Sequence, residues 1–252
     1  WGSQPTVGFK PIGYLESVWK EKKGTPRQGN VSLTSRALVK ILFGTNPRHT
    51  LTGLEAYSHV WVLWLFHDNG NKTIKALVHP PRLDGERQGI FATRTPHRPN
   101  AIGLSLCRLE GIEGDTVHLS SVDIIHGTPV LDVKPYIPDF DSVCAEGVTL
   151  PWWIRGSPVP LLSVAFNTQA EEQLSALECT FRFFKSVGEA KQTITDVLQW
   201  DPRSVHLRRS ADLTPASGKA FIFGIDSVDV SACFEGSLAT VIEVVPIFSK
   251  LK

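Results

Sequence analysis

The sequence predicts a mostly β protein, with a β-barrel-type amino-terminal domain and a smaller α+β carboxy-terminal domain. Short apolar segments separated by turn residues fill the first 150 positions, and helical patterns appear only after residue 161. Helices of about 10–15 residues do not alternate with those segments, so a doubly wound, Rossmann-type sheet is not expected. The chain has 252 residues, of which 42% are hydrophobic and 20% charged, as in ordinary globular proteins. We therefore expect two domains, at residues 8–150 and 161–252.

The amino-terminal strands are predicted from apolar segments. Residues 12–18 have strand character, and the run VWVLWLF at 60–66 is typical of a strand covered on both faces. Many short strands between turn residues indicate a sandwich or a barrel. Further strands are predicted at 74–78, 89–92, 103–109, 117–121 and 130–133, with turns at 69–71, 84–85 and 113–115.

The carboxy-terminal half mixes helices and strands. Residues 151–160 are rich in proline and aromatics and predict a linker. Residues 168–177 predict a helix, capped by Asn167 or Thr168, and residues 189–198 predict a second one. Strands at 221–226, 228–234 and 239–245 are expected to form an antiparallel meander with a hairpin turn at 235–237.

Composition excludes several classes of protein and site. The longest apolar run has seven residues, far short of a membrane span, and no signal peptide is expected. Four cysteines without a CxxC pair predict reduced thiols and a soluble cytoplasmic protein. The histidines show no HxH or HxxxH spacing, so no metal is expected, and both a Walker loop and GxGxxG are absent.

The net charge is only +1, but basic residues are clustered. Such clusters attract phosphates, although a solvated face is the simpler alternative. The clusters contain Lys20, Lys22, Lys23, Arg27, Arg36, Lys40 and Arg48, then Lys72, Lys75, Arg82, Arg87, Arg94 and Arg98, and later Arg203, Arg208 and Arg209.

The segment GIFATRTPHRPNAIGLS at 89–105 concentrates polar side chains between two apolar strands. Arg94, His97, Arg98 and Asn100 lie within seven residues, together with two prolines that make the loop rigid. A polar turn with solvated arginines is the alternative. We favour a binding loop for a small polar or anionic ligand.

The segment SVDIIHGTPVLDVKPYIP at 121–138 carries Asp123 and Asp132 among apolar neighbours. A charged residue in such a strand needs a ligand or a partner. For Asp132 the alternative is a structural salt bridge with an arginine of the first loop. The turn at 127–129 is expected to bring backbone N–H groups near a ligand. His67 ends a strand, a position where ligand contacts are common. His59 is expected in the core or behind the site.

These segments together resemble the TsaA/TrmO-like family of tRNA methyltransferases over residues 8–150, and DPR at 201–203 adds a weaker similarity. The motifs that carry the resemblance are PRQ at 26–28, GLEAYSHVWVLWLFH at 53–67, PPRL at 80–83, FATRTPHRPNAIGLS at 91–105 and DIIHGTPVLDVKPYIP at 123–138. The resemblance implies an S-adenosylmethionine-dependent enzyme with a β-barrel fold that acts as a homodimer. It also implies that the substrate is N6 of threonylcarbamoyl-adenosine at position 37 of threonine tRNAs.

The resemblance also assigns cofactor contacts. Leu104 would be an apolar floor for the adenine, and Asp123 would meet a ribose or the methionine amine. Gly29 stands where many relatives have proline, which predicts a looser loop. The cofactor-binding residues implied are Pro26, Arg27, Gln28, Phe66, His67, Arg94, Leu104, Asp123, Ile124, Ile125 and His126.

A general base for the ureido nitrogen and the tRNA contacts remain open at this point. Asp132 is preferred as the base, with Asp123 and His97 as alternatives. Two other functions also stay open: a non-catalytic module that binds S-adenosylmethionine or a nucleotide-like metabolite, and a methyltransferase of another RNA or a small molecule. Candidate substrate-binding residues are His97, Arg98, Asn100, Lys134, Tyr136 and Arg203.

Overall fold

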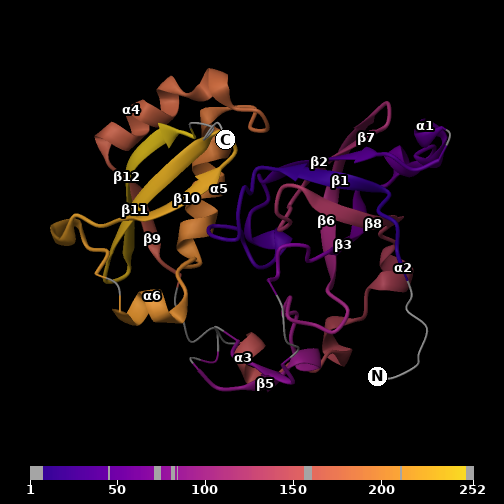
Figure 1. The fold of residues 1–252 in the computed structure, drawn as a ribbon, viewed down its shortest axis with the longest axis horizontal. Coiled ribbons are helices and arrows are strands. Elements are labelled where there is room, and N and C mark those ends of the chain that lie inside the picture. Colours follow the sequence, from indigo (N-terminus) through magenta and orange to yellow (C-terminus); the bar gives the residue numbers. More distant parts are fainter. Residues whose placement is uncertain are drawn as a thin grey trace.

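The computed structural model describes residues 8–44, 46–70, 75–80, 83, 85–155, 161–210 and 212–247. Two units lie side by side in Figure 1, a closed six-stranded barrel and a four-stranded sheet with helices against it. The predicted fold class, mostly β with a barrel rather than a Rossmann sheet, is confirmed. In the described part of the chain, no helix has both the length and the apolar character needed to cross a membrane.

The barrel is an antiparallel ring in the order β1-β2-β7-β6-β3-β8. Closure pairs β1 with β8, so every strand has two hydrogen-bonded neighbours and no edge is left open. A two-stranded ribbon, β4 (Leu77–Val78) with β5 (Gln88–Gly89), lies in the long connection between β3 and β6. The barrel strands are β1 (Gly13–Ser17), β2 (Arg36–Ile41), β3 (His59–Leu65), β6 (Ile102–Glu113), β7 (Thr116–Ser120) and β8 (Thr128–Pro135).

The barrel interior is filled by alternate residues of each strand. In β3, Val60, Val62 and Trp64 are buried, while the residues between them are partly exposed on the outer face. The prediction that 60–66 is covered on both faces is therefore wrong for this chain. Gly103 of β6 is needed here, because a Cβ at this position would lie 2.2 Å from the Trp64 ring.

Several other sequence predictions are corrected by the structure. At 89–92 the chain forms mostly a single 3-10 turn, Ile90–Ala92, and at 121–127 it forms a loop that connects β7 to β8. Of 74–78 only Leu77–Val78 is a strand, and residue 74 lies outside the described residues. Strand β2 was missed because it lies inside a basic stretch, although its Ala37, Val39 and Ile41 alternate in the way a strand requires.

The carboxy-terminal sheet has the order β10-β11-β12-β9, and β9 runs parallel to β12. The predicted meander and both predicted helices are confirmed, and Asn167 caps the first helix by accepting the N–H of Ala170 at 2.8 Å. Figure 1 shows α4 and α5 beside the sheet, where α4 contacts β12. The elements are β9 (Ser163–Phe166), α4 (Thr168–Ala176), α5 (Val187–Gln199), α6 (Val205–Ser210), β10 (Phe221–Ile225), β11 (Val228–Glu235) and β12 (Leu238–Pro246).

The segment between the two units is only partly the predicted linker. Trp152–Arg155 forms the short helix α3 with Trp153 buried, whereas 156–160 lie outside the described residues. The other short helices are α1 (Pro47–Thr50) and α2 (Pro138–Asp141). Further 3-10 turns lie at Gly29–Val31, Leu54–Ala56, Ala145–Gly147, Glu178–Thr180 and Pro215–Ser217.

The two units share buried contacts. Val18 and Trp19 follow β1, yet both belong to the hydrophobic cluster of the carboxy-terminal sheet. Trp19 also bridges to Ile225 of β10. Arg36 of β2 reaches Glu110 at 3.1 Å and Glu189 of α5 at 2.7 Å. The domain boundaries 8–150 and 161–252 stay a prediction. The core of the second unit also includes Val18 and Trp19, which lie in the first of these ranges.

Asp226, in the turn between β10 and β11, organises the junction. Its buried carboxylate accepts the backbone N–H groups of Arg182, Phe183 and Phe184 at 2.9–3.2 Å. Its own N–H donates to the carbonyl of Val18 at 2.7 Å. The carboxylate of Asp226 therefore fixes the chain before α5, and its backbone N–H fixes the residue that follows β1.

We expect Asp226→Ala to lower the free energy of unfolding by about 3 kcal/mol or more, because it strands buried N–H donors. Asp226→Asn keeps one acceptor oxygen and tolerates the positive φ of 51°, so its loss is smaller. Urea unfolding of the three proteins measures both losses. Equal midpoints for the alanine and asparagine variants would contradict this role.

Candidate functional site

The predicted binding segments gather at one end of the barrel. Because neighbouring strands are antiparallel, β1, β3 and β7 finish at the end where β2, β6 and β8 begin. Three connections leave the barrel there, at 18–35, 66–101 and 121–127, and we call this the loop end. Residues 26–28, Phe66, His67, Arg94 and 123–126 all lie on these connections.

Arg94 joins two of the three connections. Its Nη1 donates to Oε1 of Gln28 at 2.6 Å. Its charge also acts on Asp123 of the third connection, where it opposes the rise in pKa that burial causes. The structure therefore brings together Gln28, Arg94 and Asp123, three residues far apart in the sequence.

Asp123 is held from the barrel interior. Oγ of Ser105 donates to its Oδ1 at 2.5 Å, and Nε1 of Trp64 donates to the same hydroxyl at 3.0 Å. Burial raises the pKa of Asp123 above its ordinary value, while the Ser105 hydrogen bond and Arg94 act against this rise. The loop end thus presents a desolvated carboxylate beside an exposed guanidinium, a pair suited to a ligand carrying both signs of charge.

Residues 66–67 lie against the third connection. Nδ1 of His67 is 3.3 Å from Oγ1 of buried Thr128, which donates to the carbonyl of Ile125 at 2.7 Å. The Phe66 ring packs against Trp64, with ring centres 4.2 Å apart. Phe66 and His67 therefore stand next to the segment that carries Asp123.

The 121–127 loop is braced by the chain around β1. Oγ of Ser17 donates to the carbonyl of Ile124 at 2.7 Å, and Nε1 of Trp19 donates to that of Val122 at 2.6 Å. The N–H of Gly127 donates to the carbonyl of Leu15 at 2.8 Å. The prediction that the 127–129 turn brings backbone N–H groups near a ligand is therefore wrong for Gly127, whose N–H is already bonded within the protein.

Gly29 allows the 18–35 connection to pack against this loop. A Cβ at Gly29 would lie 2.1 Å from the carbonyl oxygen of Ser121, so a side chain has no room there. Gly29 is buried, and the prediction of a looser loop is wrong. Ser121 has a φ of +58°, an uncommon conformation for a residue with a side chain.

Arg98 shapes the 90–100 segment rather than extending from it. Its Nη1 donates to the carbonyl of Thr93 at 2.7 Å, and its guanidinium lies over the Phe91 ring. His97 and Asn100 are exposed on the same segment. The rigid loop expected from the two prolines is thus also fixed by an internal arginine.

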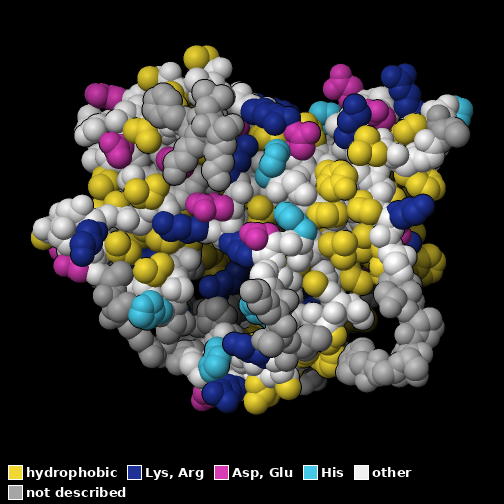
Figure 2. All heavy atoms as spheres, viewed as in Figure 1, with side chains coloured by type: hydrophobic (Ala, Val, Ile, Leu, Met, Phe, Trp, Pro, Cys, Tyr) yellow, Lys and Arg dark blue, Asp and Glu magenta, His cyan; other side chains and the backbone are white. Residues whose placement is uncertain are grey.

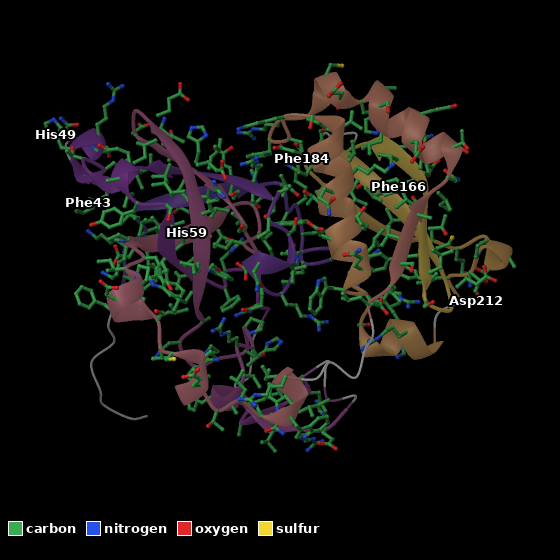
Figure 3. The ribbon with its side chains drawn as sticks, turned by 180° about the vertical axis from the view of Figure 1, so that it is seen from behind. Phe43, His49, His59, Phe166, Phe184 and Asp212 are labelled. Atoms are coloured by element: carbon green, nitrogen blue, oxygen red, sulfur yellow. The ribbon has the colours of Figure 1, made fainter. Side chains whose placement is uncertain are left out.

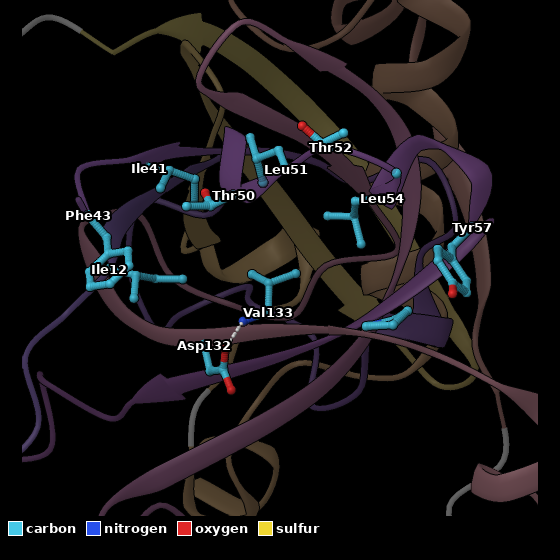
Figure 4. Close-up of a pocket in the computed structure, with 12 residues that line it drawn as sticks. Ile12, Ile41, Phe43, Thr50, Leu51, Thr52, Leu54, Tyr57, Asp132 and Val133 are labelled. Carbon is cyan, nitrogen blue, oxygen red and sulfur yellow. Dashed lines mark hydrogen bonds between the residues drawn. The ribbon is translucent and has the colours of Figure 1, made fainter. Parts of the chain in front are cut away.

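Two predicted residues lie on the outer face of the barrel instead. Leu104 is 55% exposed and alternates with the inward Ser105, so its side chain points away from Asp123. Asp132 pairs with Lys134 at 2.7 Å, so the alternative of a structural salt bridge holds, with a lysine as partner rather than an arginine. Figure 4 shows its carboxylate on the other side of the strand from Val133, whose N–H it accepts at 2.9 Å. Tyr136 packs edge-on against His59 and Trp61.

A pocket of about 600 Å³ lies at the opposite end of the barrel from Arg94. Its lining is mostly apolar and includes Ile12, Ile41, Phe43 and Leu54 (Figure 4). Seen from behind in Figure 3, Phe43 lies beyond His59, toward the far edge of the barrel. This apolar pocket and the polar cluster of the loop end are therefore separate features.

Basic residues predicted to hold tRNA have mixed positions. Arg203 is only 13% exposed at its side chain, clamps both oxygens of Asp201 at 2.8 and 2.9 Å, and stacks 3.8 Å from the Phe234 ring centre. Arg36 is held between two glutamates, as described above. Lys72, Arg82 and the side chain of Arg209 lie outside the described residues.

Sequence reasoning missed the supporting residues. Ser105 and Trp64 lie within quoted motifs, and a period-2 reading of each strand points them inward. For Trp19 no signal in the sequence marks its contact with Val122. In the described ranges no three His, Cys, Asp or Glu side chains gather as a metal site, and all four cysteines are free.

Comparisons with known proteins cover both units. The family description "tRNA-methyltransferase O N-terminal domain" matches residues 14–142. A putative S-adenosylmethionine-dependent methyltransferase, RcsF of Pseudomonas aeruginosa, is 40% identical over 202 residues, which are 80% of this chain and 84% of that protein. A crystal structure of TrmO from P. aeruginosa has a TM-score of 0.75 at 32% identity and covers 98% of this chain and 100% of its own.

The chain is also similar to mammalian proteins that are much longer than the matched segment. The tRNA (adenine(37)-N6)-methyltransferase of Rattus norvegicus is 59% identical over 136 residues, or 53% of this chain. That segment spans only 31% of the rat protein.

We expect Asp123→Asn to raise the melting temperature of the free protein at neutral pH. The folded-state pKa of Asp123 is raised, so the desolvated charge costs stability above that pKa, and this cost disappears as the pH falls through it. Each kcal/mol recovered corresponds to about 2–4 °C in a chain of this size. Calorimetric melting from neutral to acid pH should show the two proteins converging. A wild type that is more stable at neutral pH would mean that Arg94 outweighs the desolvation.

Proposed function

Because the chain belongs to the tRNA-methyltransferase O family, we propose that it transfers a methyl group from S-adenosylmethionine to N6 of adenosine 37 in tRNA. The observation that carries the proposal is the convergence of Gln28, Arg94 and Asp123 at the loop end. All three residues lie within the segment matched by the family description. They come from three connections that are far apart in the sequence.

The residues of the loop end fit the cofactor. S-adenosylmethionine offers a carboxylate to Arg94, and cationic groups or ribose hydroxyls to Asp123. Pro26, Arg27, Gln28, Phe66 and His67 would surround it, together with the backbone of Ile124, Ile125 and His126. When bound, the cofactor supplies an electrophilic methyl group on its sulfonium, so the protein's task is mainly alignment and exclusion of water.

Proton removal from the substrate nitrogen is the one further step that the chain itself would assist. Asp132, Asp123 and His97 are the candidates. The raised pKa of Asp123 and its place beside Arg94 support it, whereas Asp132 is held by Lys134 on the outer face. Asp132 would serve only if the tRNA, or a second copy, reaches that face, and a normal kcat for Asp132→Asn would remove it.

The finer substrate proposal is threonylcarbamoyl-adenosine at position 37 of threonine tRNAs. We propose that the exposed His97 and Asn100 contact the RNA, with Lys134 and Tyr136 at the outer face. Arg98 and Arg203 would act by fixing their own loops, since both are bound within the protein. A tRNA substrate also fits a cytoplasmic location.

Mass spectrometry of tRNA nucleosides tests this function directly. Threonine tRNA carrying the threonylcarbamoyl group should gain one methyl on incubation with protein and cofactor, and unmodified tRNA should not. Methylation of another RNA or a small molecule would establish the second alternative. Cofactor binding without transfer to any of these would instead favour a binding module.

A homodimer is proposed from the outer apolar face, which we define as Trp61, Leu63, Leu104 and Leu106 of β3 and β6. These side chains lie on the outside of paired strands and are all partly or fully exposed. Figure 2 shows hydrophobic side chains gathered over the barrel. Leu104 belongs to this face, so we propose that any contact it makes with the cofactor is completed across the dimer.

A charge on the outer apolar face should separate the two copies. We expect Leu106→Glu to halve the mass measured by light scattering, because a desolvated carboxylate would face apolar side chains. Leu42→Glu is the control, since Leu42 is 59% exposed and follows β2 at the other end of the barrel. A wild type that is monomeric and fully active would contradict the dimer.

We expect Arg94→Ala to weaken binding of S-adenosylmethionine by about 10- to 100-fold, the usual cost of a lost charge-assisted hydrogen bond. Because Arg94 also offsets the desolvation of Asp123, a small fall in the melting temperature of the free protein at neutral pH is expected as well. Isothermal calorimetry measures the affinity. Arg48→Ala, on α1 at the opposite end of the barrel, is the matched control. Equal affinities for both variants would remove Arg94 from the site.

A further inference from the structure

We propose that the carboxy-terminal sheet positions the cofactor loops, through Trp19 and Phe223 as positioning residues. The inference rests on the proposed function, because it assumes that the loop end binds S-adenosylmethionine. It concerns the connections 18–35 and 121–127, which carry most of the residues that would hold the cofactor. It gives the second unit a role in cofactor affinity, besides any contact that it makes with tRNA.

Trp19 ties the 121–127 loop to the carboxy-terminal core. Its ring is fully buried in the same cluster as Phe223 and Ile225. At the same time its Nε1 donates to the carbonyl of Val122 at 2.6 Å, and its carbonyl accepts the N–H of His126 at 2.8 Å. These two hydrogen bonds enclose the segment 123–125, so the position of Asp123 follows that of Trp19.

Phe223 supports the other connection. Gly24 lies directly on its ring, since a Cβ at Gly24 would approach that ring to 2.5 Å, and the φ of Gly24 is +85°. Beside it, Nζ of Lys23 lies 4.6 Å from the ring centre of Phe221 on the same strand. Between Gly24 and Gly29, which is fitted against Ser121, the chain has only four residues, and these include Arg27 and Gln28.

The two supports have a common base. Both Trp19 and Phe223 pack in one hydrophobic cluster, so a shift of β10 moves both connections together. The hydrogen bond between Gln28 and Arg94 then passes this placement to the connection at 66–101. The carboxy-terminal sheet therefore sets the distance between Asp123 and the residues Arg27 and Gln28, which would bind the cofactor.

The test compares core variants that differ in their contact with the loops. Trp19→Phe removes the N–H that holds Val122, and Phe223→Leu removes the ring under Gly24. Phe184→Leu is the matched control, because Phe184 belongs to the same cluster but its ring packs edge-on against Phe181. Gly24→Ala disturbs the contact between Gly24 and Phe223 by a change in the loop, and it leaves the core residues unchanged. It serves as a second variant in case Phe223→Leu folds poorly.

Affinity for S-adenosylhomocysteine is measured by calorimetry, with KM for both substrates and the melting temperature of each variant. We expect Trp19→Phe, Phe223→Leu and Gly24→Ala to raise Kd and the cofactor KM about three- to tenfold, with an unchanged KM for tRNA. Phe184→Leu should lower the melting temperature without changing Kd. Equal effects on Kd from all four variants, or none, would overturn the inference. A wild type that does not bind S-adenosylhomocysteine would contradict the cofactor proposal itself.

Discussion

Closure of the antiparallel barrel is the constraint on which the rest of this structure depends. Pairing of β1 with β8 leaves no free edge and fixes which connections share an end. Because direction alternates around the ring, segments near residues 28, 94 and 123 meet although long stretches of chain separate them. Close contacts inside the barrel, such as that of Gly103 with the Trp64 ring, allow the ring of strands to close around a filled interior.

The loop end contains a desolvated carboxylate, which lowers the stability of the protein and which the fold alone does not require. The carboxylate of Asp123 is partly buried and desolvated, and the hydrogen bond from Ser105, which Trp64 holds, only partly offsets this cost. Arg94 compensates from the exposed side while it binds Gln28. A ligand of complementary charge would stabilise this carboxylate, whereas the pocket at the other end of the barrel is lined mostly by apolar residues.

The second unit is joined to the first by buried groups rather than by a flexible tether. Trp19 lies in the cluster of the carboxy-terminal sheet, and Asp226 holds both the end of β1 and the chain before α5. Arg36 adds a partly buried ion pair to Glu189. The placement of one unit against the other therefore affects the position of the 18–35 connection, because this connection packs against the core of the carboxy-terminal sheet.

The sequence by itself determined the strands with clear periodicity, the two capped helices, the absence of a Rossmann sheet, and the motifs that point to the loop end. Local pattern is enough for these, because period and capping depend on near neighbours. Only the tertiary structure decided that Asp123 and Arg94 lie together at the loop end while Asp132 and Leu104 face outward, because one residue of strand register sends a side chain to the other face. The tertiary structure also decided that Arg203 binds Asp201 and stacks on Phe234, and that Trp19 belongs to the core of the carboxy-terminal sheet. Contacts between residues far apart in the chain follow from barrel closure and packing, and no local pattern carries them.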